Sequence, residues 1–241
     1  MKLYIIRHGD PDNEHNCLTE RGTQEAQLLA TYLRDVPIDA AYVSPLARAQ
    51  LTAEPVLRVK GMTAETCEWL TEFDAPIRRP DRDGLSITWD WLPEDWTPVD
   101  DFLSVETWTR PTVMAERDVV EKYGEVCRGL DALLDSHGYR RDGRLYRAHR
   151  PNHDTVALFC HFGVECVMLG HLLHISPMTL WHGFCALPSS VTTIYTEERR
   201  EGIASFRVSE YGSLCHLYQN GVEPSFSARF CECFTDSTRH D

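Results

Sequence analysis

The chain has 241 residues, and its 37 acidic side chains outnumber its 24 lysines and arginines, which gives a formal net charge of -13. This charge disfavours nucleic acid or an anionic membrane surface as the main partner, because both repel an acidic protein. The sequence shows no apolar run of membrane-spanning length and no signal-peptide pattern. We therefore expect a single cytoplasmic domain, residues 1–241, that acts on a small molecule; the sequence does not indicate an oligomeric state.

The nine cysteines are odd in number and lack paired CxxC spacing. Free thiols are therefore expected rather than a disulfide framework or a zinc site. Two histidine pairs, His149 with His153 and His171 with His174, have spacings that metal ligands use. Because no acidic or cysteine ligands accompany them, we expect packing or surface roles, and we predict neither a metal nor a cofactor.

The chain opens with an apolar strand over residues 2–6 that runs directly into Arg7-His8-Gly9. A neutral imidazole can attack phosphorus, and a guanidinium binds phosphate oxygens in a bidentate manner. After a loop, Thr19 can cap a helix, because apolar residues recur behind it at helical spacing. The first elements are thus a strand, a turn suited to phosphoryl chemistry and a crossover helix.

Residues 38–43 form a second predicted strand, which ends at Ser44-Pro45. A hydroxyl residue followed by proline is typical of a helix start. We expect a helix from this point that carries Arg48 near its beginning and is kinked or ended by Pro55. Arg48 then lies close to the C-terminal end of the second strand.

A third extended stretch, residues 62–66, leads to two carboxylates, Glu72 and Asp74, beside bulky apolar residues. Residues 78–110 then contain several prolines, four tryptophans and little periodicity, which is typical of a lid or a binding insertion. Tryptophans need burial or a ligand, so this segment is not expected to be disordered. The tryptophans either form a satellite core or contact the substrate.

The second half of the chain continues the alternation. A long helix is expected over residues 112–137, and a buried strand over 155–160 ends at His161, where Gly163 opens another helix. Two further strands, near residues 191–195 and 203–208, are joined by a hairpin. This order predicts an α/β fold, a three-layer sandwich with a mainly parallel central sheet and helices on both faces.

Three chemically useful side chains, His8, Arg48 and His161, all fall at or just beyond the end of a predicted strand. In an open α/β sheet the ligand crevice lies outside the carboxyl ends of the strands. The fold itself therefore brings these three residues to one crevice, and two of them open helices whose N-terminal amides favour an anion.

With this order of motifs, nearly the whole chain resembles the histidine phosphatase superfamily, also called the phosphoglycerate mutase-like family. The matching elements are Arg7-His8-Gly9, Leu18-Thr19-x-x-Gly22-x-x-Glu25-Ala26, Ser44-Pro45-Leu46-x-Arg48-Ala49-x-x-Thr52-Ala53, Leu70-x-Glu72 and His161-Phe162-Gly163. The resemblance implies that His8 becomes a phosphohistidine, that Arg7, Arg48 and His161 hold the phosphoryl group, and that Glu72 protonates the leaving oxygen. It implies no metal.

Two features depart from the commoner family pattern. After the first glycine the chain reads Asp10-Pro11-Asp12-Asn13-Glu14, so Asn13, the candidate for a further phosphate contact, is displaced by one position. Phe162 follows the second histidine where a small residue is common, and it either narrows the pocket or turns away from it.

The chemistry requires particular protonation states. His8 must be neutral, with one ring nitrogen held by an acceptor such as a backbone carbonyl, and a protonated His161 would stabilise phosphoryl oxygens. Glu72 must be protonated to act as an acid, and apolar neighbours can raise its pKa. Asp74 and Asp10 remain alternative acids.

The sequence thus predicts a phosphatase that hydrolyses a small phosphomonoester through a phosphohistidine on His8. A phosphoglycerate mutase is the alternative enzyme, but a mutase needs extra cations for the substrate carboxylate, and residues 78–110 hold more acids than bases. A non-catalytic phosphoryl-binding protein is the alternative from another class, and the presence of both histidines and a candidate acid disfavours it.

Overall fold

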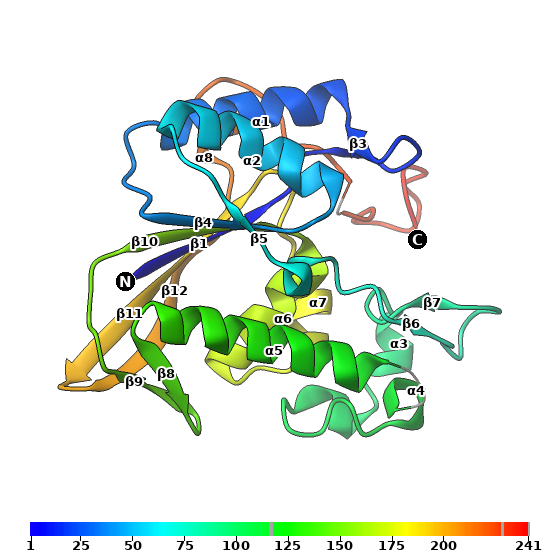
Figure 1. Cartoon of the computed structure of the whole chain (residues 1–241). Helices are drawn as coiled ribbons and strands as arrows, with labels where there is room; N and C mark the ends of the chain where they lie inside the picture. Colours follow the sequence, from blue (N-terminus) through cyan, green and yellow to red (C-terminus); the bar gives the residue numbers. More distant parts are fainter. Residues whose placement is uncertain (116–117, 228, 241) are drawn as a thin grey trace.

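The computed structural model describes residues 1–115, 118–227 and 229–240, in which helices cover both faces of a central sheet (Figure 1). The sheet order is β5 (Glu65–Thr66), β4 (Ala40–Val43), β10 (Thr155–Cys160), β1 (Lys2–Arg7), β11 (Val191–Arg200), β12 (Ile203–Ser213), β9 (Leu145–Ala148) and β8 (Tyr139–Asp142). The first four strands in this order pair in parallel, and the remaining pairs are antiparallel. The predicted α/β sandwich is confirmed, with the refinement that its sheet is mixed.

The helices divide between the two faces of the sheet (Figure 1). One face carries α1 (Glu20–Leu33), α2 (Ala47–Lys60) and α8 (Cys215–Tyr218), and the other carries α5 (Val119–Ser136), α6 (Phe162–Leu173) and α7 (Pro177–Gly183). Alternation along β1 sends Leu3 and Ile5 into the core below α5 and α6, and Ile6 into the core below α1 and α2. Each core buries one face of the strand that ends at the first histidine.

The first crossover helix begins as predicted, because the Thr19 hydroxyl accepts a hydrogen bond from the backbone N–H of Gly22 at 3.0 Å. The second helix departs from the prediction in two ways. It begins at Ala47 rather than at Ser44-Pro45, and it continues past Pro55 to Lys60. The Ser44 hydroxyl accepts a hydrogen bond from the backbone N–H of Leu46 at 3.2 Å and also bonds to a histidine ring.

The middle of the chain forms shorter and more numerous elements than its hydrophobic periodicity predicts. The expected helix over residues 112–137 is observed as α4 (Thr112–Ala115) and α5, and residues 116–117 lie outside the described residues. The basic segment behind it forms the hairpin of β8 and β9, which the sequence analysis missed. The many charged residues of this segment obscure a short alternation of buried and exposed side chains, in which Tyr139, Tyr146 and Ala148 are the buried ones.

Residues 78–110 form short elements and contribute a few buried side chains. Four short elements occur in and beside this segment: β6 (Pro76–Ile77), β7 (Ser86–Ile87), α3 (Pro93–Trp96) and the 3₁₀ helix η2 (Asp100–Leu103). Trp91 and Trp108 are only 6% and 1% exposed and join the core of the α5 face, whereas Trp89 and Trp96 are half-buried. The tryptophans therefore serve mainly as core; the role of the segment as a lid or insertion stays a prediction.

None of the nine cysteines, all of which lie in the described part of the chain, forms a disulfide, as the sequence predicted. No helix among residues 1–115, 118–227 and 229–240 is long and apolar enough to cross a membrane.

Candidate active site

Two neighbouring parallel strands each end in a buried histidine. The register of β1 and β10 pairs Arg7 with Cys160, so the next residue of each strand, His8 and His161, lies beside the other. Their ring centroids are 5.0 Å apart, and the side chains are 4% and 0% exposed. The predicted meeting of strand ends therefore occurs, and it forms the centre of the candidate site.

The ring of His8 is fixed by its own backbone turn. Nδ1 lies 2.7 Å from the carbonyl oxygen of Gly9, and a carbonyl only accepts, so Nδ1 carries the proton. Burial lowers the pKa of His8 well below its usual value, and the charges of Arg7 and Arg48 lower it further. His8 is therefore a neutral imidazole whose Nε2 keeps its lone pair, as nucleophilic attack requires.

The ring of His161 is fixed at both nitrogens. Arg48 donates from Nε to Nδ1 of His161 at 3.2 Å, which makes that nitrogen an acceptor and leaves the proton on Nε2, 2.8 Å from the Ser44 hydroxyl. Burial lowers the pKa of His161 well below its usual value, and the nearby His8, Arg48 and Arg7 act in the same direction. The expectation of a protonated His161 is therefore corrected: the ring is neutral.

Arg7, the last residue of β1, is buried. Its Nη1 donates to the carbonyl of Ala186 at 2.5 Å, and its guanidinium lies 5.7 Å from the ring centroid of Phe162. Phe162 also meets the ring of Trp89 edge to face, with centroids 5.8 Å apart. The bulky residue after the second histidine therefore packs beneath an arginine rather than turning away.

Glu72 follows the short 3₁₀ helix η1 (Glu68–Leu70) and rests on the first turn of α6. Its Oε1 accepts hydrogen bonds from the backbone N–H of Phe73 at 2.7 Å and of Val164 at 3.2 Å. Burial raises the pKa of Glu72, although these bonds and the two arginines oppose the rise. A β-carbon on Gly163 would lie 2.5 Å from Oε1, so the carboxyl approaches α6 only because this residue is glycine.

The alternative acids are differently placed. Asp74 is exposed and forms an ion pair with Lys122. Asp10 accepts hydrogen bonds from the hydroxyls of Thr19, at 2.8 Å, and of Ser225 and Ser227. Burial raises the pKa of Asp10, but these three bonds outweigh it and hold the pKa below its usual value. Glu72 is the carboxyl whose surroundings favour the protonated form.

Asn13 lies on the exposed turn between β2 (Pro11–Asp12) and β3 (Cys17–Leu18). No hydrogen bond of its side chain occurs among the described residues. Its phosphate contact stays a prediction.

Sequence reasoning missed the residues that hold the site together. Ser44 was interpreted as a helix cap but bonds to His161, and the Thr52 hydroxyl accepts a hydrogen bond from the backbone N–H of Gly9 at 2.9 Å. Gly9 and Gly22 face each other so closely that a β-carbon on Gly9 would lie 2.7 Å from the carbonyl oxygen of Gly22. Spacing could have indicated Thr52, because it lies one helical turn beyond Arg48 and therefore on the same face of α2.

The sequence profile of the histidine phosphatase superfamily (branch 1) matches residues 3–208, and the chain belongs to this superfamily. Phosphoserine phosphatase 1 of Hydrogenobacter thermophilus is 25% identical over 241 aligned residues, which cover 92% of this chain and 97% of that protein. The adenosylcobalamin/alpha-ribazole phosphatase of Salmonella typhi is 22% identical over 191 residues, covering 76% of this chain and 84% of the relative. The prediction of a hydrolase of the histidine phosphatase type is confirmed at this level.

Solved structures share the fold. A phosphoserine phosphatase variant from Entamoeba histolytica superposes with a TM-score of 0.59 at 18% identity, over 90% of this chain and 98% of that one. An alpha-ribazole phosphatase from Shigella flexneri superposes with a TM-score of 0.55 at 21% identity, over 88% of this chain and 96% of that one. These likenesses confirm the predicted architecture.

Proposed function

We propose that the protein hydrolyses a small phosphomonoester through a covalent phosphohistidine on His8. The observation that carries the proposal is the hydrogen bond from Nδ1 of His8 to the Gly9 carbonyl, which leaves Nε2 as a nucleophile beside two arginines. The superfamily membership and the phosphatase names of the matched relatives favour hydrolysis over transfer to a second acid.

In the first half-reaction Nε2 of His8 attacks phosphorus, and the bond from phosphorus to the ester oxygen breaks. The leaving oxygen takes the electron pair of that bond and the proton of Glu72, whose raised pKa keeps the proton available. Arg7 and Arg48 stabilise the equatorial phosphoryl oxygens as charge spreads over them. The products are a phosphohistidine, an alcohol and an ionised Glu72.

In the second half-reaction water attacks the phosphohistidine. Glu72, now ionised, accepts a proton from the water, and the bond from phosphorus to Nε2 returns its electron pair to the ring. Neutral His8, protonated Glu72 and inorganic phosphate result. The Gly9 carbonyl holds the ring orientation throughout, because it bonds only to Nδ1.

Substitution of the nucleophile tests the proposal. We expect His8→Ala to lower kcat/KM for an alkyl phosphate by about 10³-fold or more. Rapid quenching of the wild-type enzyme with a ³²P-labelled ester should trap an acid-labile, base-stable label, which His8→Ala should lack.

The matched control is His149→Ala, since His149 is a half-exposed histidine at the end of β9 whose side chain has no place in the site. It should label and turn over like the wild type. Near-normal turnover by a folded His8→Ala protein, or labelling of that protein, would overturn the proposal.

A further inference from the structure

A second buried carboxyl lies on α6, one helical turn beyond His161, and the proposed chemistry does not use it. Glu165 is only 1% exposed, and its backbone N–H donates to the carbonyl of His161 at 3.0 Å. Glutamates are almost never buried so completely unless they are paired. The partners of Glu165 connect it to the candidate site.

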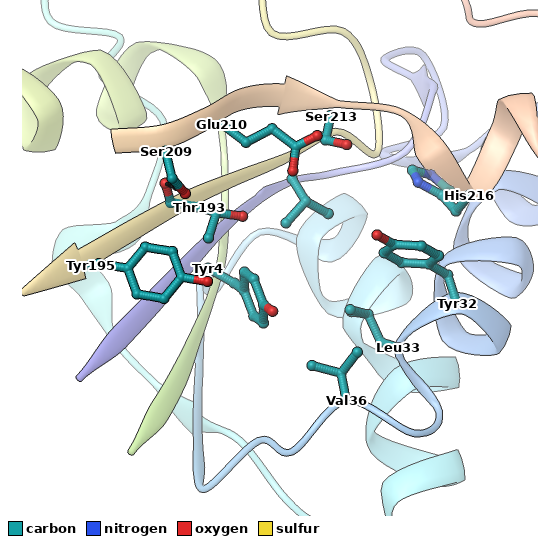
Figure 2. Close-up of a pocket in the computed structure, with 11 residues that line it drawn as sticks. Tyr4, Tyr32, Leu33, Val36, Thr193, Tyr195, Ser209, Glu210, Ser213 and His216 are labelled. Atoms are coloured by element: carbon teal, nitrogen blue, oxygen red, sulfur yellow. Dashed lines mark hydrogen bonds between the residues drawn. The ribbon is translucent and has the colours of Figure 1, made fainter. Parts of the chain in front are cut away.

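The carboxyl of Glu165 is held between α6 and the sheet. Its Oε1 accepts a hydrogen bond from the Thr192 hydroxyl at 2.5 Å, and the same hydroxyl oxygen accepts one from the backbone N–H of Gly212 at 3.1 Å. Thr192 pairs with Ile5 across β1 and β11, and Ile5 belongs to the core on the α6 face. Figure 2 shows the opposite face, where the next residue, Thr193, lines a pocket between α1 and the sheet. Strand alternation thus directs Thr192 toward Glu165 and away from that pocket.

Arg7 is a buried cation without a direct ion pair among the described residues. Its Nη1 bonds to the Ala186 carbonyl, and its Nε is buried with no hydrogen-bond partner in the same part of the chain. A guanidinium stays charged in a protein, so a buried one needs compensation. Burial lowers the pKa of Arg7, and the charges of Glu72 and Glu165 oppose this effect most strongly. Glu165 therefore acts on Arg7 through its charge rather than through a shared hydrogen bond.

Glu165 can change its charge near neutral pH. Burial raises the pKa of Glu165 to about 7; the Thr192 hydroxyl and the charge of Arg7 oppose the rise, and the charge of Glu72 adds to it. Three further titratable groups of β10, α6 and β12 interact with Glu165, but burial raises their pKa values above the usual ones and they stay neutral: Cys160, Cys166 and Tyr211. The carboxyls are thus the groups of this cluster that can exchange a proton near pH 7.

A bound oxyanion reverses the balance of charge around Arg7. Before binding, an ionised Glu165 offsets the guanidinium. After binding, the oxyanion offsets it, and the ionised carboxyl then repels the oxyanion. Binding therefore favours the protonated form of Glu165, and by linkage the protonated form favours binding.

We propose that Glu165 is a positioning residue for Arg7, and that its carboxyl takes up a proton when an oxyanion binds to Arg7 and releases it when the oxyanion leaves. The proton comes from solvent and returns to it, and no bond to phosphorus forms or breaks in this step. The inference deepens the proposed function and rests on its assignment of Arg7 to the phosphoryl group.

Sulfate is the probe, because it resembles a phosphoryl group, stays doubly charged between about pH 6 and pH 8 and is not hydrolysed. Titration calorimetry of the full chain, in buffers of different ionisation enthalpy at constant ionic strength, counts the protons taken up as sulfate binds. At pH 7 we expect Glu165→Gln to take up about 0.3 proton fewer than the wild type, as follows from roughly fivefold tighter binding to the protonated form. Glutamine keeps an oxygen for the Thr192 hydroxyl and cannot titrate, and protons taken up by Glu72 cancel because both proteins retain it.

Glu25→Gln is the matched control. Glu25 on α1 is also a fully buried glutamate, and burial raises its pKa to about 7. Its Oε2 accepts a hydrogen bond from the backbone N–H of Asp10 at 2.8 Å, and Arg7 affects its pKa less than Asp10 and Arg21 do. Glu25→Gln should keep most of the wild-type proton uptake. A loss as large as that in Glu165→Gln would overturn the assignment to Glu165.

Wild-type protein that binds sulfate without taking up protons would overturn the proposal even if neither variant folded. Equal proton uptake by the wild type and Glu165→Gln would also overturn it, and would leave Glu165 as a structural link between α6 and β11. Neither result would affect the label on His8, which tests the proposed hydrolysis. No sulfate binding at all would contradict the assignment of Arg7 itself and would overturn the coupling with it.

Discussion

A histidine lies at the end of β1 and another at the end of β10, each has a carboxyl residue near it, and the two pairs differ in their hydrogen bonds. At the end of β1, His8 keeps a free nitrogen, while the carboxylate of Asp10 is held ionised by three hydroxyls. At the end of β10, both nitrogens of His161 are engaged, while the half-buried Glu72 contacts the start of α6 and has a raised pKa. In the proposed mechanism, the β1 side provides the nucleophile and a carboxylate that takes no part in the reaction, and the β10 side provides a fixed ring and the acid.

For the two histidines, hydrogen-bond partners rather than burial distinguish the proposed roles, whereas burial is the main cause of the raised pKa of Glu72. Both histidines are buried and both have lowered pKa values, yet a carbonyl partner leaves one ring nucleophilic and an arginine with a serine leaves the other without a free lone pair. Among the described residues, none hydrogen-bonds to Nε2 of His8.

The largest expected effect comes from the acid on the β10 side. Glu72→Gln should lower kcat for an alkyl phosphate by about 10²–10⁴-fold, and much less for p-nitrophenyl phosphate, whose leaving group needs no proton. In the wild type the raised pKa makes kcat fall as pH rises through it, and this limb should vanish in the variant. A pH profile with both substrates measures this, and equal losses on the two substrates would remove Glu72 as the acid.

His161→Gln should have the next largest effect. Glutamine retains a polar group near Ser44 and loses the acceptor for Arg48, so the guanidinium is no longer fixed. We expect kcat/KM to fall by about 10²–10³-fold, with the ³²P label still forming slowly on His8. A variant that cannot be labelled at all would mean that the two histidines do not differ in the way described.

Ser44→Ala tests how the ring of His161 is held, with a smaller expected loss of activity. It removes the partner of Nε2 of His161 and leaves a buried N–H unpaired, which costs about 1–3 kcal/mol. Activity should fall by about tenfold. The matched control is Ser86→Ala on β7, a half-buried serine whose hydroxyl forms no hydrogen bond in the described part of the chain. Steady-state kinetics of both proteins decide whether Ser44 positions the ring.

Asp10→Asn should have the smallest effect on catalysis, within about twofold, and a measurable effect on stability. The hydroxyl bonds keep the folded pKa of Asp10 low, so its ionised form stabilises the fold above the unfolded pKa, and this is lost as pH falls through the folded value. Tm should drop by about 2–4 °C at pH 7. In thermal melts, the difference in Tm between the two proteins should close as pH falls through the folded-state pKa of Asp10. A loss of activity as large as that of Glu72→Gln would reverse the assignment of the two carboxyls.

The positions of His8 and His161 could be predicted because adjacent parallel strands end at one edge of a sheet, and strand ends are legible in the sequence. The requirement for an acceptor at one ring nitrogen of His8 followed from the chemistry, and the structure identifies the nitrogen as Nδ1 and the acceptor as the Gly9 carbonyl. The sequence could narrow the acid to a few nearby carboxyl residues. The preference for Glu72 among them depends on burial, which only the fold determines.

The remaining features depend on contacts with no local pattern. Ser44-Pro45 carries the signal of a helix cap, and nothing in that signal predicts the bond of the Ser44 hydroxyl to a histidine 117 residues away. Asp10 is bound by Ser225 and Ser227, from a tail without periodicity, over separations of 215 and 217 residues. The neutral state of His161 follows from an arginine that points its Nε at the ring, which spacing cannot reveal.

The facing glycines at positions 9 and 22 have a practical consequence for redesign. A β-carbon on Gly22 would lie 2.2 Å from the carbonyl oxygen of Asp10, so neither position accommodates even one methyl group. A mutant library for altered specificity should leave this pair unvaried and place its diversity in the loops around the site. Any variation at the pair would move the attacking nitrogen before it changed what the enzyme recognises.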